Sequence, residues 1–234
     1  MIYVISDLHG YAAEKLERLL KKADFGEDDY LYVLGDVVDR TGDGGVGVLR
    51  WLTERENAQL ILGNHEAMLL SCDFVFEEIT DESIGSMTNE KLELLQNYLL
   101  NGGGVTLQAF RGIGRKAQND ILDYLRDCPL FEAVTAGDRD FILVHAGLQN
   151  FRKDRRLSDY TADELIWTSP APDEAYFEEV HTVFGHTPTK CYGDAYDGRI
   201  YSTDTWTCID CGVSLGNPPV LLCLDTWETF TGEK

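Results

Sequence analysis

Three short apolar runs near the start of the chain constrain its fold most strongly. Residues 2–6 (IYVIS), 31–34 (LYVL) and 59–62 (QLIL) are largely apolar stretches, a pattern typical of strands that are covered on both faces. They alternate with stretches of helical periodicity at residues 12–23 and 47–56. This alternation predicts a βαβαβ unit and therefore a fold of the α/β class.

The middle of the chain has a different character, because helical patterns replace the strands there. These patterns cover residues 67–79, 89–100 and 115–127, with interruptions at the acidic stretch 77–90 and at the Asn-Gly-Gly-Gly of residues 101–104. We interpret residues 66–130 as a helical insertion or cap. The rest of the chain returns to strands, which we expect at residues 141–144, 182–184, 205–209, 220–224 and 227–230.

Length and charge limit the possible classes of function. With 234 residues, 44% of them hydrophobic, the chain can bury a full core, and we expect a single domain over residues 1–234. Because 41 acidic residues face only 20 basic ones, a nucleic-acid polymer is not expected as a partner, whereas small anions remain possible. The opening MIYVISDLHG has neither the basic segment of a signal peptide nor a membrane anchor, so we expect a cytoplasmic protein without a membrane partner.

Five of the predicted strands end in residues that can bind metals or transfer protons. In open α/β sheets the carboxyl ends of the strands form the ligand crevice, so we expect these residues to converge. We refer to these stretches as the strand-end segments. They are residues 6–10 (SDLHG), 35–40 (GDVVDR), 63–66 (GNHE), 145–147 (HAG) and 185–188 (GHTP).

A simpler interpretation is that each of these residues caps a helix or forms a turn. A single Asp or His after a strand is more often of this kind, and we keep that interpretation for Glu66 and His181. Caps, however, have no use for histidine. A mixture of carboxylate, imidazole and amide oxygen is what borderline divalent metals take as ligands.

The number of potential ligands predicts two metal ions. Six protein ligands exceed what a catalytic zinc ion with an open position would use. A carboxylate in the middle of the set, Asp36, is the expected bridge. Two ions about 4 Å apart can generate a hydroxide nucleophile and clamp a phosphoryl group. The predicted ligands are Asp7, His9, Asp36, Asn64, His145 and His186.

The six cysteines do not form a disulfide or zinc framework. Only Cys208 and Cys211 have a suggestive spacing, and no second close pair exists to complete a structural zinc site. We expect both to be buried apolar residues without a redox or metal function.

The ordered series SDLHG, GDVVDRT, GNHE, HAG and FGHTP resembles the signature of the calcineurin-like metallophosphoesterases. The pattern is that of the phosphoprotein phosphatase branch, and it spans residues 5–188. Smaller stretches, YLLNGGGVTLQAF, YLRDCPLFEAV and LIWTSP, are similar to small bacterial and lambda-phage-like serine/threonine protein phosphatases. The resemblance implies a four-layer α/β-β/α sandwich with two metals at its centre, usually manganese in vitro, or iron and zinc.

Roles for individual residues also follow from the resemblance. It assigns Asp7, His9 and Asp36 to one metal, and Asp36, Asn64, His145 and His186 to the other. His65 falls on the general acid, Asp39 on the carboxylate that orients it, and Arg40 on a phosphate-binding position, with Asn64 also at the substrate. These roles agree with the chemistry, because an imidazole titrates near neutral pH and a guanidinium can hold two phosphoryl oxygens.

Three departures from the family pattern concern turns and substrate binding. Ser6 replaces the first glycine of the pattern, and Thr41 replaces the glycine after Arg40, where Gly42 can serve instead. The family also supplies a second phosphate-binding arginine between its last two motifs, but residues 168–186 contain neither Arg nor Lys. The second contact to phosphate therefore comes from elsewhere or is missing.

The expected function is that of a metal-dependent phosphomonoesterase. The main hypothesis is a serine/threonine protein phosphatase that can also accept phosphotyrosine, acting on a phosphorylated protein or a small phosphoester. The alternative is a dinucleoside tetraphosphate hydrolase of the same branch, which would need basic residues that this chain offers sparingly. A non-catalytic phosphate-binding module is a third hypothesis, and the retention of every predicted ligand and of the acid argues against it.

Overall fold

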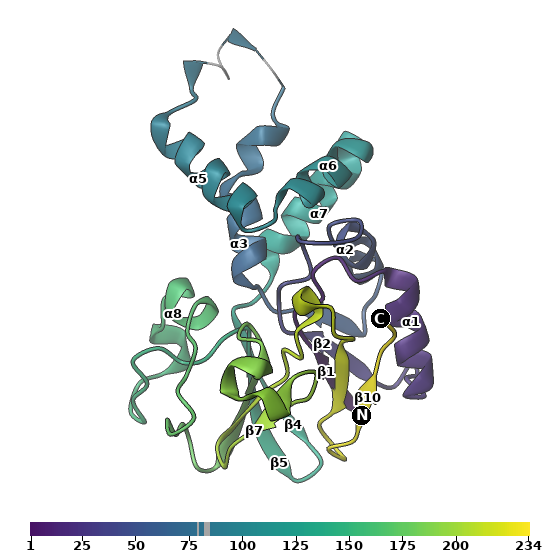
Figure 1. The fold of residues 1–234 in the computed structure, drawn as a ribbon, viewed down its shortest axis with the longest axis vertical. Coiled ribbons are helices and arrows are strands. Elements are labelled where there is room, and N and C mark those ends of the chain that lie inside the picture. The colour runs from purple at the N-terminus through teal and green to yellow at the C-terminus, as the bar shows by residue number, and fades with distance from the viewer. Residues whose placement is uncertain (79, 82–84) are drawn as a thin grey trace.

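The computed structural model describes residues 1–78, 80–81 and 85–234, and its body consists of two five-stranded sheets (Figure 1). The first sheet has the order β10-β9-β1-β2-β3. Its three N-terminal strands are parallel, which confirms the predicted βαβαβ unit, while β9 is antiparallel to β1 and β10 is antiparallel to β9. The strands are β1 (Ile2–Ile5), β2 (Tyr30–Val33), β3 (Ala58–Leu60), β9 (Val220–Cys223) and β10 (Thr229–Thr231).

The second sheet has the order β4-β5-β6-β8-β7. Its central strands are parallel and each edge strand is antiparallel to its neighbour. Sequence analysis did not predict the two edge strands, because β4 is mostly half-exposed with a mixed pattern and β7 has only two residues. The strands are β4 (Phe131–Ala136), β5 (Arg139–Val144), β6 (Val180–Phe184), β7 (Tyr201–Ser202) and β8 (Trp206–Cys208).

Three apolar cores separate four layers, as predicted. Val4 of β1 packs between the two sheets, whereas Tyr3 and Ile5 on the other face pack against α1 (Ala13–Lys22) and α2 (Val46–Thr53). This double coverage explains why β1 is apolar along its whole length. A third core, which includes Trp206, covers the outer face of the second sheet beside α8 (Ala162–Ile166).

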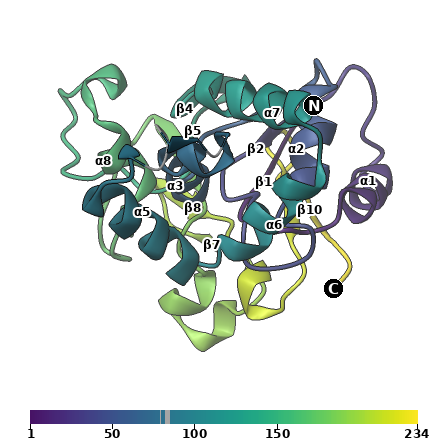
Figure 2. The same ribbon diagram turned by 90° about the horizontal axis from the view of Figure 1, so that it is seen from above.

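The helical insertion stands at one end of the sheets, above the carboxyl ends of the strands (Figures 1 and 2). The prediction of one helix over residues 67–79 was wrong, because α3 ends at Ser71 and a 3₁₀ turn follows; Ile79 lies outside the described residues. Sequence analysis also missed α6, which begins at Gly104, inside the stretch that was interpreted as an interruption. The insertion contains α3 (Asn64–Ser71), η1 (Asp73–Phe76), α5 (Asn89–Leu100), α6 (Gly104–Gly112) and α7 (Arg115–Asp127).

Short 3₁₀ segments complete the described structure. They are η2 (Leu157–Asp159), η3 (Thr189–Tyr192), η4 (Asp194–Tyr196) and η5 (Val213–Leu215). Within the part of the chain that the structure describes, no helix has the length and apolar character needed to span a bilayer. The assignment of residues 1–234 to a single domain stays a prediction.

Candidate active site

The five strand-end segments meet where the carboxyl ends of the two sheets face each other, below the insertion. The segment after β1 lies on the segment after β2, since the Asp7 and His9 amides donate to the carbonyls of Gly35 and Asp36 at 3.1 and 2.9 Å. The segment after β6 approaches just as closely, because a Cβ at Gly185 would lie 2.1 Å from Asp7 Oδ2. The predicted convergence is therefore observed.

Left-handed backbone is concentrated in these segments. Positive φ angles are uncommon for residues other than glycine, and they cluster where function requires a strained backbone. The sequence does not reveal this feature. The residues of the site with positive φ are Asp7 (53°), His9 (42°), Asp36 (55°), Asp39 (77°), Arg40 (68°) and His186 (68°).

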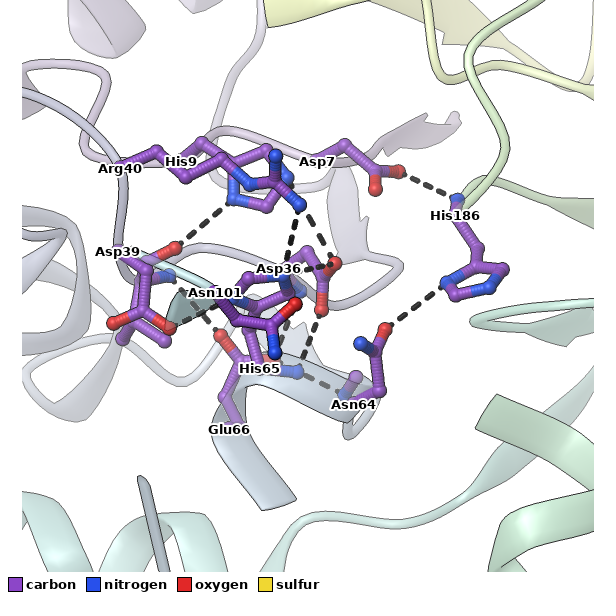
Figure 3. A network of polar contacts seen from close by, with 12 residues as sticks. Asp7, His9, Asp36, Asp39, Arg40, Asn64, His65, Glu66, Asn101 and His186 are labelled. Atoms are coloured by element: carbon purple, nitrogen blue, oxygen red, sulfur yellow. Dashed lines mark hydrogen bonds and ion pairs between the residues drawn. The ribbon is translucent and has the colours of Figure 1, made fainter. Parts of the chain in front are cut away.

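Asp36 lies at the centre of the site (Figure 3). It belongs to two groups whose potential ligand atoms lie within 4.8 Å of one another. One group adds His9 and His65, and the other adds His145 and His186. A carboxylate shared by two such groups is suited to bridge two cations.

Lone pairs of His145, Asn64 and Asp36 face one another beside the second group. His145 is neutral because burial lowers its pKa well below the usual value, and its Nδ1 lies 2.7 Å from the Leu34 carbonyl, to which it donates. Its Nε2 lone pair then faces Asn64 Oδ1 at 2.9 Å and Asp36 Oδ1 at 3.4 Å. Three acceptors that face one another fit a cation between them.

Asp7 belongs to neither group, but its carboxylate is incompletely satisfied. Oδ2 accepts hydrogen bonds from the Ser6 hydroxyl and from the His186 amide, the latter at 2.9 Å. Oδ1 is buried and has no hydrogen-bond partner among the described residues. An orphaned buried carboxylate oxygen also fits a metal ligand.

Burial changes the pKa of most groups in the site. It raises the pKa of Asp36 to about 8, although His65 opposes this shift, and it raises the pKa of Asp7 well above its usual value, with the charges of Asp210 and Asp36 adding to the shift. It lowers the pKa of His9 to about 3 and that of His186 to about 4. Neutral imidazoles beside carboxylates that are costly to ionise form a donor set that a bound cation would stabilise.

His65 and Asp39 form a separate buried pair. His65 Nδ1 lies 2.7 Å from Asp39 Oδ2, so Nδ1 carries a proton, and Nε2 points toward Arg40, whose Nη2 is 3.2 Å away. Burial lowers the pKa of His65, but the hydrogen bond to Asp39 and the charge of Asp36 outweigh it and raise the pKa. His65 Nε2 and His9 Nε2 each lie 3.8 Å from Asp36 Oδ2, so only the contacts to Asp39 and Arg40 distinguish His65 from a ligand.

Sequence analysis underestimated Glu66. Glu66 does accept from the Gly63 amide at 3.1 Å, as expected of a helix cap. It also accepts from the amides of Asp36, Val37 and Val38 at 2.8, 2.8 and 3.1 Å. One buried side chain thus fixes the whole turn that carries Asp36.

Asp210 was missed altogether. It follows β8, is 2% exposed, and accepts from the Gly212 amide at 2.9 Å, while burial raises its pKa to about 6. Its charge contributes to the raised pKa of Asp7. The strand-end rule, applied to residues 205–209, would have found it.

The remaining candidates are not among the potential ligands of the two groups. Cys208 and Cys211 are buried free thiols, as expected, and belong to neither ligand group. His181 lies within β6, where its Nε2 contacts Thr207 Oγ1 at 2.9 Å, so it is not a turn residue as expected.

Comparison with known proteins identifies the class to which this fold and site belong. A model of the calcineurin-like phosphoesterase family matches residues 1–213. The chain therefore belongs to this family.

Among curated proteins the chain is similar to symmetrical bis(5'-nucleosyl)-tetraphosphatases. It is 28% identical to that of Acidovorax sp. over 202 residues, which cover 84% of the chain and 57% of the relative. It is 35% identical to that of Chromobacterium violaceum over 199 residues, which cover 82% of the chain and 58% of the relative. The chain thus spans little more than half the length of these relatives.

Two solved structures share the fold. A putative diadenosine tetraphosphatase aligns with a TM-score of 0.65 at 19% identity, covering 98% of this chain and 91% of that one. A serine/threonine phosphatase from Saccharomyces cerevisiae aligns with a TM-score of 0.57 at 16% identity, covering 100% and 80%. At these identities the likeness concerns the fold alone.

Replacing Asp36 by asparagine should weaken metal binding by more than about tenfold, because both ligand groups lose their shared charge. Metal content after dialysis, measured by elemental analysis, checks this. Asp43→Asn is the matched control, since Asp43 follows the same strand and accepts from the Gly45 and Gly47 amides at 3.0 and 2.8 Å, outside the site. Two tightly held metals in Asp36→Asn would contradict the shared-ligand assignment.

Replacing Glu66 by glutamine should lower the free energy of unfolding by about 1–3 kcal/mol, because either orientation of the amide points its NH₂ at two backbone N–H groups. Urea denaturation measures the change. Glu174→Gln, at an exposed glutamate that accepts from the Ala171 amide at 2.9 Å, should stay within about 0.5 kcal/mol. Equal stability of the two variants would show that Glu66 does not anchor the turn.

Proposed function

We propose that the chain is a metal-dependent phosphohydrolase that cleaves dinucleoside polyphosphates. The observation that carries the hydrolase assignment is the shared position of Asp36 between two ligand groups, next to the His65–Asp39 pair and Arg40. Phosphoryl transfer by such a site needs metals, a proton donor and a phosphate-binding cation, and all of these have candidates in one place.

The metal ligands are proposed as the resemblance assigns them. Asp7, His9 and Asp36 would hold one divalent ion, and Asp36, Asn64, His145 and His186 the other; manganese, iron and zinc are the candidates. Bound there, the ions would supply an activated water as nucleophile and positive charge for the phosphoryl oxygens.

Side chains of the protein would bind the phosphoryl group and protonate the leaving oxygen. Arg40 is exposed at the site and its guanidinium can hold two phosphoryl oxygens, while Asn64 lies next to His186. His65 would give the proton on Nε2 to the leaving oxygen, and Asp39 would hold the ring through Nδ1.

The choice of substrate rests on the curated relatives, whose names specify a symmetrical bis(5'-nucleosyl)-tetraphosphatase. Space for a nucleoside exists beside the site. A hollow of about 580 Å³ is lined by Phe151, Trp167 and polar side chains such as Gln149. The Trp167 ring, 46% exposed, lies edge-on to the His186 ring at 6.1 Å, so this hollow begins next to a predicted metal ligand.

A phosphomonoester, including a phosphorylated protein, is the second candidate because of charge. Arg40 is the only Lys or Arg in the five strand-end segments, in a chain of net charge −21. A single guanidinium suits one phosphoryl group better than a tetraphosphate. A cytoplasmic location stays a prediction in either case.

A side-by-side assay separates the two candidates. The manganese-loaded chain is given diadenosine tetraphosphate and phosphoserine or phosphotyrosine peptides at equal concentration, and the products are resolved by anion-exchange chromatography. We expect faster cleavage of diadenosine tetraphosphate, into two molecules of ADP. Faster release of phosphate from the peptides would favour the second candidate, and cleavage of neither would refute the proposal.

Replacing His65 by asparagine should slow the reaction by about 10²- to 10⁴-fold for substrates with poor leaving groups, because a positioned acid is lost. A p-nitrophenolate leaves without a proton, so p-nitrophenyl phosphate should be affected much less than phosphoserine peptide, with Asp39→Asn showing a milder version of the same bias. His181→Asn, outside the site, is the control for loss of an imidazole. Equal losses on both substrates, with metal content intact, would mean that the acid lies elsewhere.

A further inference from the structure

The helical insertion contacts Asp39, the carboxylate that holds the proposed acid His65, through two hydroxyl groups. Tyr98 of α5 donates its phenol proton to Asp39 Oδ1 at 2.6 Å, and the Thr106 hydroxyl of α6 lies 2.6 Å from the same oxygen. The other carboxylate oxygen, Oδ2, holds His65 Nδ1 at 2.7 Å. All four residues are at most 1% exposed.

Thr106 holds Asp39 in two ways. Its oxygen accepts from the Asp39 amide at 3.0 Å, so the hydroxyl proton is free to donate. The proton can go to Asp39 Oδ1 or to the Gly44 carbonyl at 3.1 Å, and the shorter, charge-assisted bond is the stronger one. One side chain of the insertion thus fixes both the backbone and the carboxylate of Asp39.

Glycine backbone packs closely against both side chains, since a Cβ at Gly44 would lie 2.8 Å from Thr106 Oγ1. A Cβ at Gly103 would lie 2.5 Å from the Tyr98 ring, so the turn between α5 and α6 closes directly over that ring. Burial raises the pKa of the Tyr98 phenol, which therefore remains a donor.

Any buried carboxylate needs donors, so the contacts alone would fit a merely structural role. Two features indicate that these donors also orient Asp39 toward His65. Both donors bind Oδ1, which leaves Oδ2 to His65, and both are neutral, so they hold Asp39 without competing with His65 for its charge.

We infer that Tyr98 and Thr106 are positioning residues through which the helical insertion fixes the orientation of Asp39 and, through it, of the His65 ring. This inference rests on the proposed role of His65 as general acid. Within the described part of the chain, neither side chain hydrogen-bonds to a group expected to bind phosphate or metal, so their loss should affect kcat for poor leaving groups and leave KM nearly unchanged.

The test uses the metal-loaded full chain with phenyl phosphate and p-nitrophenyl phosphate. Tyr98→Phe and Thr106→Val should each lower kcat on phenyl phosphate by about ten- to a hundredfold, the worth of one hydrogen bond to a buried charge, and lower it much less on p-nitrophenyl phosphate. Thr106→Ser keeps the hydroxyl and should restore the rate. Tyr124→Phe is the matched control, because this phenol of the same insertion instead accepts from the Leu60 amide at 3.2 Å.

A spectroscopic measurement makes the test independent of turnover. In the zinc-loaded protein the Nδ1 proton of His65, identified by its absence in His65→Asn, should give a downfield NMR resonance. Tyr98→Phe should shift or broaden it, and Tyr124→Phe should not. An unchanged resonance, or equal rate losses on both esters with thermal stability intact, would overturn the inference. Failure of His65→Asn itself to show the leaving-group bias would instead refute the acid assignment.

Discussion

Five carboxylates buried around one point are the constraint on which the rest of this structure depends. Asp7, Asp36, Asp39, Glu66 and Asp210 are each at most 2% exposed, and a buried carboxylate is costly unless it is hydrogen-bonded or paired. The chain satisfies two of them itself. Glu66 receives four backbone N–H groups, and Asp39 receives hydroxyls and an imidazole. Asp7 and Asp36 are different, because among the described residues Asp7 Oδ1 has no partner, and Asp36 Oδ1, which accepts from the His65 amide at 3.0 Å, also faces the neutral His145. The unsatisfied part of the site is therefore the part where cations are proposed.

The strained backbone of the site follows from the same constraint. To bring carboxylates and imidazoles from several strand ends to one point, the chain must turn sharply, and residues such as Asp36 and Asp39 adopt left-handed conformations. Each such residue costs about 1–3 kcal/mol unless its surroundings enforce the conformation. Here the turns are enforced from two sides, by main-chain hydrogen bonds between the segments after β1 and β2 and by the bonds from that second segment to Glu66. Glu66 thus links the strain to the start of α3, the helix that carries Asn64 and His65.

Sequence reasoning succeeded where local patterns determine structure and failed where tertiary contacts do. Apolar runs covered on both faces predicted the central strands, and the strand-end rule brought Asp36 and His145 together correctly. The half-exposed edge strand β4 lacks a clear pattern, and α6 begins with a glycine that reads as a helix breaker. Asp210 was not predicted, because it lies between Cys208 and Cys211 and only the spacing of these two cysteines was considered in that stretch. The contacts of Tyr98 and Thr106 with Asp39 join residues 59 and 67 positions apart, and no periodicity in the sequence reports them.

The second sheet and the helical insertion hold different groups of the site. The second sheet contributes His145 and His186, whose nitrogens face Asn64 at 2.9 and 3.0 Å, and so it determines the geometry of one proposed metal. The insertion instead holds Asp39 and, with it, His65. The proposed metal site and the proposed acid therefore depend partly on different elements, but they share α3, which carries both Asn64 and His65, and the segment after β2, which carries both Asp36 and Asp39. Changes in α5 and α6, which carry Tyr98 and Thr106 but no proposed metal ligand, would thus adapt the proposed acid to a different leaving group, such as a phosphoanhydride oxygen that hardly needs a proton or a serine alkoxide that does, while the proposed metal ligands stay the same.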